Sequence, residues 1–155
     1  MHGIPTVGLR FFNVYGPRQD PSSPYSGVIS IFCDRVRCGA PIDIFGDGGQ
    51  TRDFVYVADV VAALLAAMRL APTDAPVFNV CTGTATSVLE LAHTIAHLAG
   101  TRLDARHRPP RAGEIRHSTG SPAMSRSILG LAEPVSLRHG LGEVLNWLGG
   151  PIVSP

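Results

Sequence analysis

The feature that most constrains the fold of this chain is a mostly apolar run near its start, residues 6–12, which ends at Asn13. Glycines and prolines recur in the segment that follows, so residues 14–27 are expected to form a long loop. A buried strand that leads into a long loop is where α/β proteins bind ligands. Such a strand normally lies in the middle of a sheet, so its neighbours have to be found elsewhere.

Short apolar runs alternate with amphipathic stretches along the chain, which indicates a parallel α/β architecture. The stretch 59–70 is apolar on nearly all sides, so we expect a buried helix with Asp59 as its N-cap. Ser87 and Glu90 have the spacing of a capping box and predict another helix start. The predicted strands are 6–12, 42–45, 53–57, 77–80 and an extended segment from 103. These strands are too few for a doubly wound sheet. The predicted helices are 28–37, 59–70, 87–97, 123–129 and 136–148.

Composition excludes several classes of protein. Hydrophobic residues make up 45% of the 155 residues and charged residues 16%, as in globular chains. The net charge is +1 without a basic block, which argues against a nucleic-acid-binding protein. The longest apolar run, 60–68, is too short to cross a bilayer, and the start of the chain lacks the features of a signal peptide. Three cysteines without metal-binding spacing are typical of a reducing interior, so we expect a cytoplasmic protein that binds neither nucleic acid nor membrane.

Several arginines are placed where an anionic ligand could be held. Arg52 lies between a Gly-rich turn at 46–49 and a predicted strand, where its guanidinium could bind a phosphate or pair with an aspartate. The residues alone favour the ion pair. Further along, four arginines around one glutamate suit a polyanionic small molecule, although a solvated charged strand is the simpler interpretation. These residues are Arg106, Arg108, Arg111, Arg116 and Glu114.

Three other features are interpreted as ordinary structure. His93 and His97 lie one helical turn apart but have no third ligand nearby, so we predict no metal site. The segment 79–87 combines a strand end, a turn and a helix start; an anion could bind there, but a structural turn is favoured. The cysteines are expected to be small buried or half-buried thiols. They are Cys33, Cys38 and Cys81.

Four segments in order resemble the NAD-dependent epimerase/dehydratase family, the extended short-chain dehydrogenase/reductase group that acts on nucleotide-diphosphate sugars. They are GLRFFNVYGPRQDP, IDIFGDGGQTRDFVYVADVV, FNVCTGTATSVLELAHTIA and RPPRAGEIRHS. The resemblance runs from residue 3 to 148 and is greatest to UDP-glucose and UDP-N-acetylglucosamine 4-epimerases. It implies the C-terminal part of a Rossmann-type fold together with a small substrate-binding α/β subdomain.

The same resemblance implies that the cofactor half lies outside this chain. The sequence has no Gly-x-x-Gly-x-x-Gly turn, and all 13 basic side chains are arginine, so the family's Tyr-x-x-x-Lys pair is absent. Tyr15, Tyr25 and Tyr56 therefore have no lysine partner. Met1 is interpreted as a new start inside a longer reading frame. We expect no catalytic residue here, NAD only in the complete enzyme, and an N-terminal Rossmann half as partner.

The site residues that the resemblance implies are almost all on the substrate side. Phe11 is the one expected cofactor contact. The substrate contacts are Asn13 for the sugar or its diphosphate, Asp43 and Phe45 for the wall of the uracil pocket, Arg52 and Arg111 for the diphosphate, and Glu114 for the ribose.

The implied function is the nucleotide-diphosphate-sugar-binding half of an NAD-dependent sugar epimerase, inactive alone. A non-catalytic nucleotide-sugar-binding subunit and the product of a truncated gene are the alternatives. The sugar is left open, as is the choice between epimerase, dehydratase and decarboxylase. We predict remnants of the Rossmann sheet at 1–26 and 51–100, a substrate-binding subdomain at 27–50 and 101–148, and a tail at 149–155.

Overall fold

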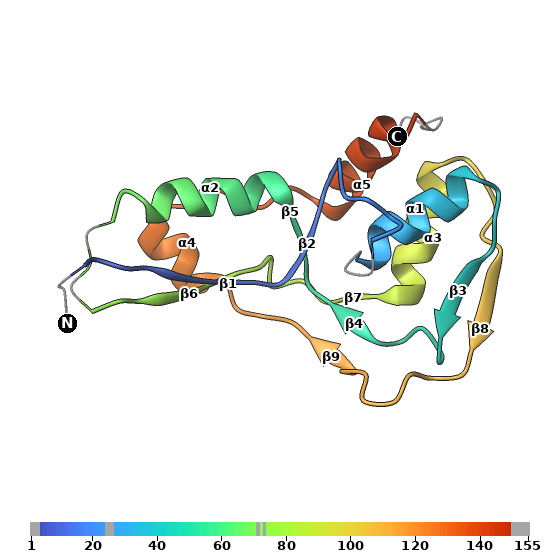
Figure 1. Cartoon of the computed structure of the whole chain (residues 1–155), viewed down its shortest axis with the longest axis horizontal. Helices are drawn as coiled ribbons and strands as arrows, with labels where there is room; N and C mark the ends of the chain where they lie inside the picture. The colour runs from blue at the N-terminus through green and yellow to red at the C-terminus, as the bar shows by residue number, and fades with distance from the viewer. Residues whose placement is uncertain (1–3, 24–26, 71, 73, 150–155) are drawn as a thin grey trace.

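The computed structural model describes residues 4–23, 27–70, 72 and 74–149 (Figure 1); Met1, Tyr25 and most of the predicted tail lie outside them. Helices α2 and α4 lie along strands β1 and β6 in one extended part of the molecule, and α1, α3 and α5 gather near β3 and β8 in the other. The strands are β1 (Gly8–Phe11), β2 (Asn13–Tyr15), β3 (Ile42–Phe45), β4 (Thr51–Arg52), β5 (Phe54–Tyr56), β6 (Val77–Val80), β7 (Thr86–Ser87), β8 (Ala105–Arg108) and β9 (His117–Ser118). The helices are α1 (Val28–Arg37), α2 (Val57–Ala67), α3 (Val88–Leu98), α4 (Ala123–Leu129) and α5 (Leu137–Trp147).

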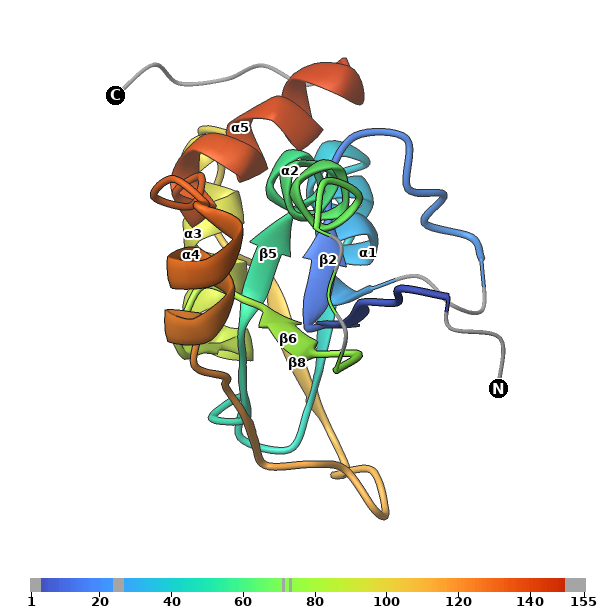
Figure 2. The same cartoon turned by 90° about the vertical axis from the view of Figure 1, so that its left-hand side faces the viewer.

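Parallel pairing dominates the sheets. β1 pairs with β6, β2 with β5 and β3 with β8, all in parallel register. β2 and β5 lie side by side near the middle of the molecule (Figure 2). β4 is parallel to β9 and antiparallel to β7. Parallel strands joined through helices confirm the predicted α/β class.

The first predicted strand divides into two at Phe12, so the prediction that the extended run ends at Asn13 is wrong. The Phe12 amide donates to the Val80 carbonyl at 3.1 Å, on the β6 side. The next amide, that of Asn13, donates to the Asp53 carbonyl at 3.0 Å, on the β5 side. The chain therefore changes its pairing partner here and continues as β2, which places Asn13 beside the strand that follows Arg52.

Helix starts are predicted well where a side chain caps the helix. The Ser87 hydroxyl accepts a hydrogen bond from the Glu90 amide at 3.1 Å, which confirms the predicted start of α3. The N-cap predicted for α2 is wrong, because β5 runs directly into the helix and Val57 is its first residue. Asp59 lies in the first turn, and its carboxylate accepts from the Val135 amide at 3.0 Å. That carboxylate therefore fixes a distant loop instead of capping its own helix.

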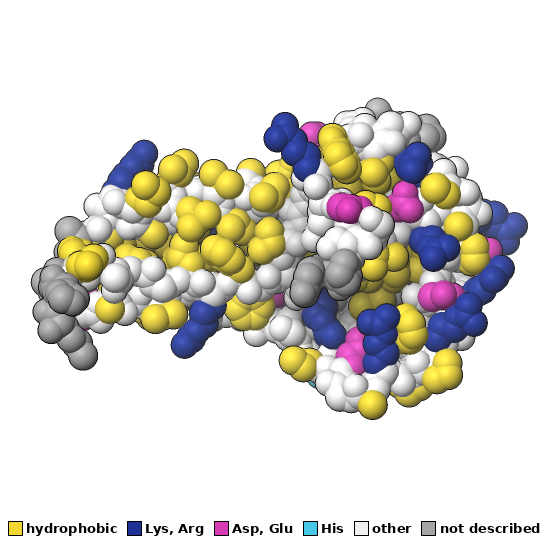
Figure 3. All heavy atoms as spheres, in the orientation of Figure 1, with side chains coloured by type: hydrophobic (Ala, Val, Ile, Leu, Met, Phe, Trp, Pro, Cys, Tyr) yellow, Lys and Arg dark blue, Asp and Glu magenta, His cyan; other side chains and the backbone are white. Residues whose placement is uncertain are grey.

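The expectation that α2 is buried on nearly all sides is also wrong. Val60, Ala63 and Ala67 are buried against the neighbouring strands. The opposite side is exposed, with Leu65 at 52% and Met68 at 80%. Figure 3 shows hydrophobic side chains gathered over this part of the molecule. A helix that is apolar on all sides is expected to be buried by neighbouring elements on all sides. Among the described residues, no element covers the side of α2 that carries Leu65.

The largest core cluster holds the site-bearing elements together. Helix α1 packs against α3 and α5, and both α1 and α3 pack against β3. Ile44 of β3, Leu91 of α3 and Leu141 of α5 are completely buried in this cluster. Each such side chain contributes about 1.5–3 kcal/mol by leaving water. The result is a rigid support for the end of β3 and the turn that follows it.

Candidate functional site

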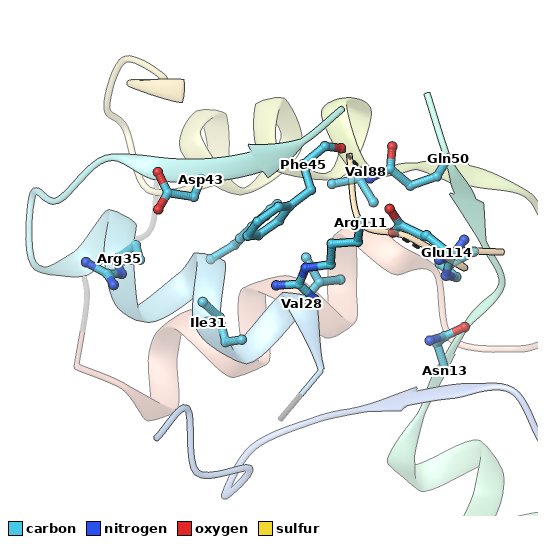
Figure 4. A pocket seen from close by; sticks show the side chains of 12 residues that line it. Asn13, Val28, Ile31, Arg35, Asp43, Phe45, Gln50, Val88, Arg111 and Glu114 are labelled. Atoms are coloured by element: carbon cyan, nitrogen blue, oxygen red, sulfur yellow. Dashed lines mark hydrogen bonds and ion pairs between the residues drawn. The ribbon is translucent and has the colours of Figure 1, made fainter. Parts of the chain in front are cut away.

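One cavity of about 360 Å³ gathers the substrate-side residues that the sequence predicts. It lies between α1, the end of β3, β4 and the segment 109–116 that joins β8 to β9. Asp43 lies toward one end of the cavity, Arg111 near its middle and Asn13 toward the other end (Figure 4). The predicted residues that line it are Asn13, Asp43, Phe45, Arg52, Arg111 and Glu114. The structure brings all six together; that each contacts a ligand stays a prediction.

An aromatic and cationic wall forms the middle of the cavity. The Arg111 guanidinium carbon lies 3.8 Å from the centre of the Phe45 ring, within cation–π distance. Gln50, which is 4% exposed, donates from its Nε2 to the Phe45 carbonyl at 3.0 Å. This bond fixes the end of β3 and therefore the position of the ring.

Arg52 is held at two points. Its Nη1 donates to the carbonyl of Thr51 at 2.8 Å, and its Nη2 lies 3.3 Å from Glu114 Oε1. The side chains of this ion pair are 18% and 27% exposed, for Arg52 and Glu114 respectively. The sequence predicted an ion pair between Arg52 and an aspartate. The ion pair forms, but its carboxylate comes from a glutamate 62 residues further along the chain. That pair joins β4 to the segment carrying Arg111.

Two of the four arginines in the predicted cluster form ion pairs with aspartates. Arg108 forms two hydrogen bonds to the carboxylate of Asp43, at 3.0 and 3.4 Å. Arg116 does the same with Asp47, at 2.6 and 2.7 Å, and holds the pKa of that carboxyl well below its ordinary value. The Asp47 pair braces the 46–49 turn, in agreement with its interpretation as a plain turn. Of the four arginines, Arg111 is the one that lines the cavity.

Two tyrosines and two histidines outside the cavity are candidates for proton transfer or metal binding. Burial is the main cause that raises the pKa of both Tyr15 and Tyr56, the opposite of what a tyrosine base requires. His93 and His97 are exposed, and the described residues contain no group of three or more potential metal ligands.

The cysteines are free thiols with different exposures. Burial raises the pKa of Cys33 to about 12 and that of Cys81 to about 11, so both stay protonated. Cys38 is exposed, which corrects the expectation that all three are at least half-buried. In the part of the chain that the structure describes, no helix is long and apolar enough to cross a membrane.

The expected cofactor contact lies apart from the cavity. Phe11, the one expected contact, is 47% exposed on β1 and lies away from the cavity, beside Leu64 and Met68 of α2. The chain has neither the Gly-rich turn nor the lysine that the resemblance requires. The role of Phe11 stays a prediction.

Sequence reasoning missed part of the cavity wall. Val28, Ile31 and Arg35 of α1 line it, whereas the apolar spacing of residues 28–37 predicts only the helix. Gln50 was missed because a glutamine after a turn carries no motif of its own. The signal that could have found it is its place between the Gly-rich turn and Arg52, where a buried amide can fix both.

The sequence of this chain is similar to those of known sugar-nucleotide enzymes. The model of the NAD dependent epimerase/dehydratase family matches residues 1–81. A putative UDP-glucose 4-epimerase of Methanocaldococcus jannaschii is 42% identical over 96% of this chain and 47% of its own length. The UDP-glucose 4-epimerase of Mycolicibacterium smegmatis is 40% identical over 87% of this chain and 42% of its length.

Solved structures of sugar-nucleotide epimerases share the fold of this chain. The UDP-glucose 4-epimerase of Thermotoga maritima, solved with UDP-glucose, superposes with a TM-score of 0.85 at 40% identity, over 91% of this chain and 45% of that one. A UDP-N-acetylglucosamine 4-epimerase of Methanobrevibacter ruminantium gives 0.84 at 31% identity, over 92% and 45%. The fold is therefore the C-terminal part of a Rossmann-type epimerase fold. The chain belongs to the NAD-dependent epimerase/dehydratase family and spans about half the length of the curated relatives it matches.

Proposed function

We propose that this chain is the nucleotide-diphosphate-sugar-binding half of an NAD-dependent sugar epimerase of the UDP-glucose 4-epimerase type, and that it is inactive without the cofactor half. The observation that carries the proposal is the order of groups along one cavity. Asp43 lies at one end, Arg111 near the middle and Asn13 at the other end (Figure 4). A nucleotide sugar presents its base, diphosphate and sugar in the same order.

Each group matches the chemistry of its part of the ligand. The Phe45 ring offers a flat apolar surface to a pyrimidine base. Arg52 and Arg111 offer permanently charged, forked donors, and each charge-assisted hydrogen bond to a diphosphate contributes roughly 1.5–3 kcal/mol. A carboxylate such as Glu114 accepts from ribose hydroxyls, and the Asn13 carboxamide can donate and accept at the sugar end.

Ligand binding requires two contacts of this structure to be exchanged. Arg111 now stacks on Phe45, and Arg52 now pairs with Glu114. A base seated on Phe45 would move the Arg111 guanidinium toward the diphosphate. The diphosphate in turn would replace Glu114 at Arg52 and free that carboxylate for the ribose. Both exchanges use residues of the segment 109–116.

A separate Rossmann half is the partner that the proposal needs. Relatives of this chain have been solved with NAD bound, among them the Thermus thermophilus UDP-glucose 4-epimerase. The apolar face made by Phe11, Val61, Leu64, Leu65 and Met68 is exposed on this chain. A cofactor half packed there would bury it and continue the β1–β6 pair into a wider sheet. The same face favours the alternative of a subunit that pairs with a separately encoded half.

Calorimetric titration with UDP tests the substrate side of the proposal. Arg52→Ala and Arg111→Ala should each weaken UDP binding by about 10- to 150-fold, from the loss of one charge-assisted contact. Arg37→Ala is the matched control, because that exposed arginine pairs with Asp34 on α1 outside the cavity and should leave UDP binding unchanged. Equal affinity for UDP in all four proteins would refute the assignment of this cavity.

A further inference from the structure

One carboxylate outside the cavity, that of Asp53, is completely buried between β4 and β5. Its Oδ1 accepts hydrogen bonds from the amide and the hydroxyl of Thr82, both at 2.8 Å. Its Oδ2 accepts from the amide of Gly83 at 2.9 Å and from the amide of Gly120 at 3.4 Å. A buried carboxylate is costly unless its oxygens are satisfied, and here donors from two other segments satisfy it.

Two of the segments that meet at Asp53 carry candidate ligand contacts. Asp53 directly follows Arg52, and its carbonyl accepts from the Asn13 amide at 3.0 Å. Gly120 lies just beyond β9, the strand that follows the 109–116 segment. Asp53 therefore connects β4 to β2 through its backbone carbonyl, and to residues 82–83 and 120 through its carboxylate.

The packing around this junction leaves no room for adjustment. A Cβ added at Gly120 would lie 2.5 Å from Cζ of Phe12 and 2.8 Å from the Cys81 sulfur. Both distances are shorter than any van der Waals contact allows, so Gly120 fits only without a side chain. Tight packing of this kind transmits a displacement of the carboxylate to its neighbours.

We propose that Asp53 is a positioning residue for the nucleotide-sugar site: its buried carboxylate fixes the end of β4, and with it Arg52, against residues 82–83 and 120. Asp53 does not touch the cavity and acts through Arg52. The inference rests on the proposed function of Arg52 as a diphosphate ligand. It goes beyond that function, because it makes affinity for the diphosphate depend on a group that the ligand never contacts.

Asp53→Asn is the test, since it keeps the side chain's volume but presents an N–H donor to backbone N–H donors. UDP affinity, calculated per folded molecule, should fall by about tenfold. In the Arg52→Ala background the same substitution should change UDP affinity by less than about twofold, because the contact that it positions is already gone. Thr82→Val, which removes one of the two Oδ1 donors, is the milder second variant and should act in the same direction by about threefold.

If Asp53 had a purely structural role, Asp53→Asn would lower the stability of the fold, and its effect on UDP affinity would not depend on Arg52. Full UDP affinity in folded Asp53→Asn, or an equal loss of affinity with and without Arg52, would overturn the inference. A ligand-independent readout is the NMR signal of the Arg52 Nε–Hε group, which should broaden in Asp53→Asn and stay sharp in Arg37→Ala. Wild-type protein that binds no UDP would refute the proposed function, and an unchanged Arg52 signal would still refute the positioning role separately.

Discussion

If Arg52 binds the diphosphate as proposed, Glu114 competes with the ligand, and removing its charge should strengthen diphosphate binding. In the structure, Arg52 Nη2 lies 3.3 Å from Glu114 Oε1, and a phosphate oxygen bound at Nη2 would take the place of that contact. Glu114→Gln keeps the length of the side chain but removes the charge. Inorganic pyrophosphate is the informative ligand, because it has no ribose for Glu114 to bind.

The size of the effect follows from the exposure of the pair. At 18% and 27% side-chain exposure the ion pair is partly screened by water, so its strength lies near the upper end of the 0.2–1 kcal/mol measured for accessible pairs. Releasing it should raise pyrophosphate affinity by about two- to fivefold at low ionic strength. The gain should shrink as salt is added, since screening weakens the competing pair.

Calorimetric titration of pyrophosphate into wild type and Glu114→Gln measures the effect directly. The Arg52→Ala/Glu114→Gln double variant is the control, because without Arg52 the glutamate has no ion pair to release. UDP should behave differently: if Glu114 also binds the ribose, its affinity should rise less than that of pyrophosphate, or fall. Unchanged or weaker pyrophosphate binding in Glu114→Gln would refute the competition.

Three further outcomes are expected. Leu91→Ala in the core of the α1–α3–α5 part should lower the free energy of unfolding by about 2–5 kcal/mol in urea titrations, and a loss under 1 kcal/mol would contradict its place there. Met68→Glu on the exposed face of α2 should leave the stability of this chain within about 0.5 kcal/mol but weaken its capture by a co-expressed Rossmann half; stronger or equal capture would count against that face. Because burial raises the pKa of Cys33 to about 12 from an ordinary 9.0, the unfolded chain loses this proton first, and the free energy of unfolding should fall between about pH 9 and 12. Cys33→Ala should flatten that fall in pH-dependent urea titrations, and an identical pH dependence would show that the thiol is not its source.

Local patterns predict much of this fold because their causes are local. The apolar spacing of residues 28–37 and the Ser87 hydroxyl act within one or two helical turns, and α1 and α3 form where these patterns predict. The change of pairing partner at Phe12 depends on two strands far along the chain, so no local pattern predicts it. The start of α2 is likewise fixed by β5, which leaves Asp59 free to bind a loop 76 residues away.

The exposed side of α2 shows a different limit of sequence reasoning. Apolar residues on all sides of a helix predict that each side packs against another element, but they do not predict whether that element belongs to the same chain. The cavity was reached through the resemblance and not through spacing: Arg52 and Arg111 lie 59 positions apart. The residues alone favoured an ion pair for Arg52 and a solvated charged strand for Arg111. Gln50 and the α1 residues were missed because their role depends on tertiary position.

The most direct test of the central claim is epimerisation of UDP-glucose by a reconstituted pair. The purified chain is mixed with the N-terminal half of a relative, which supplies the Gly-rich turn and the Tyr-x-x-x-Lys pair, and UDP-galactose formation is followed with NAD present. We expect no turnover by this chain alone, turnover on mixing, and a loss of turnover when the chain carries Arg52→Ala. Turnover by the purified chain alone, or a mixture in which Arg52→Ala is as active as wild type, would contradict this expectation.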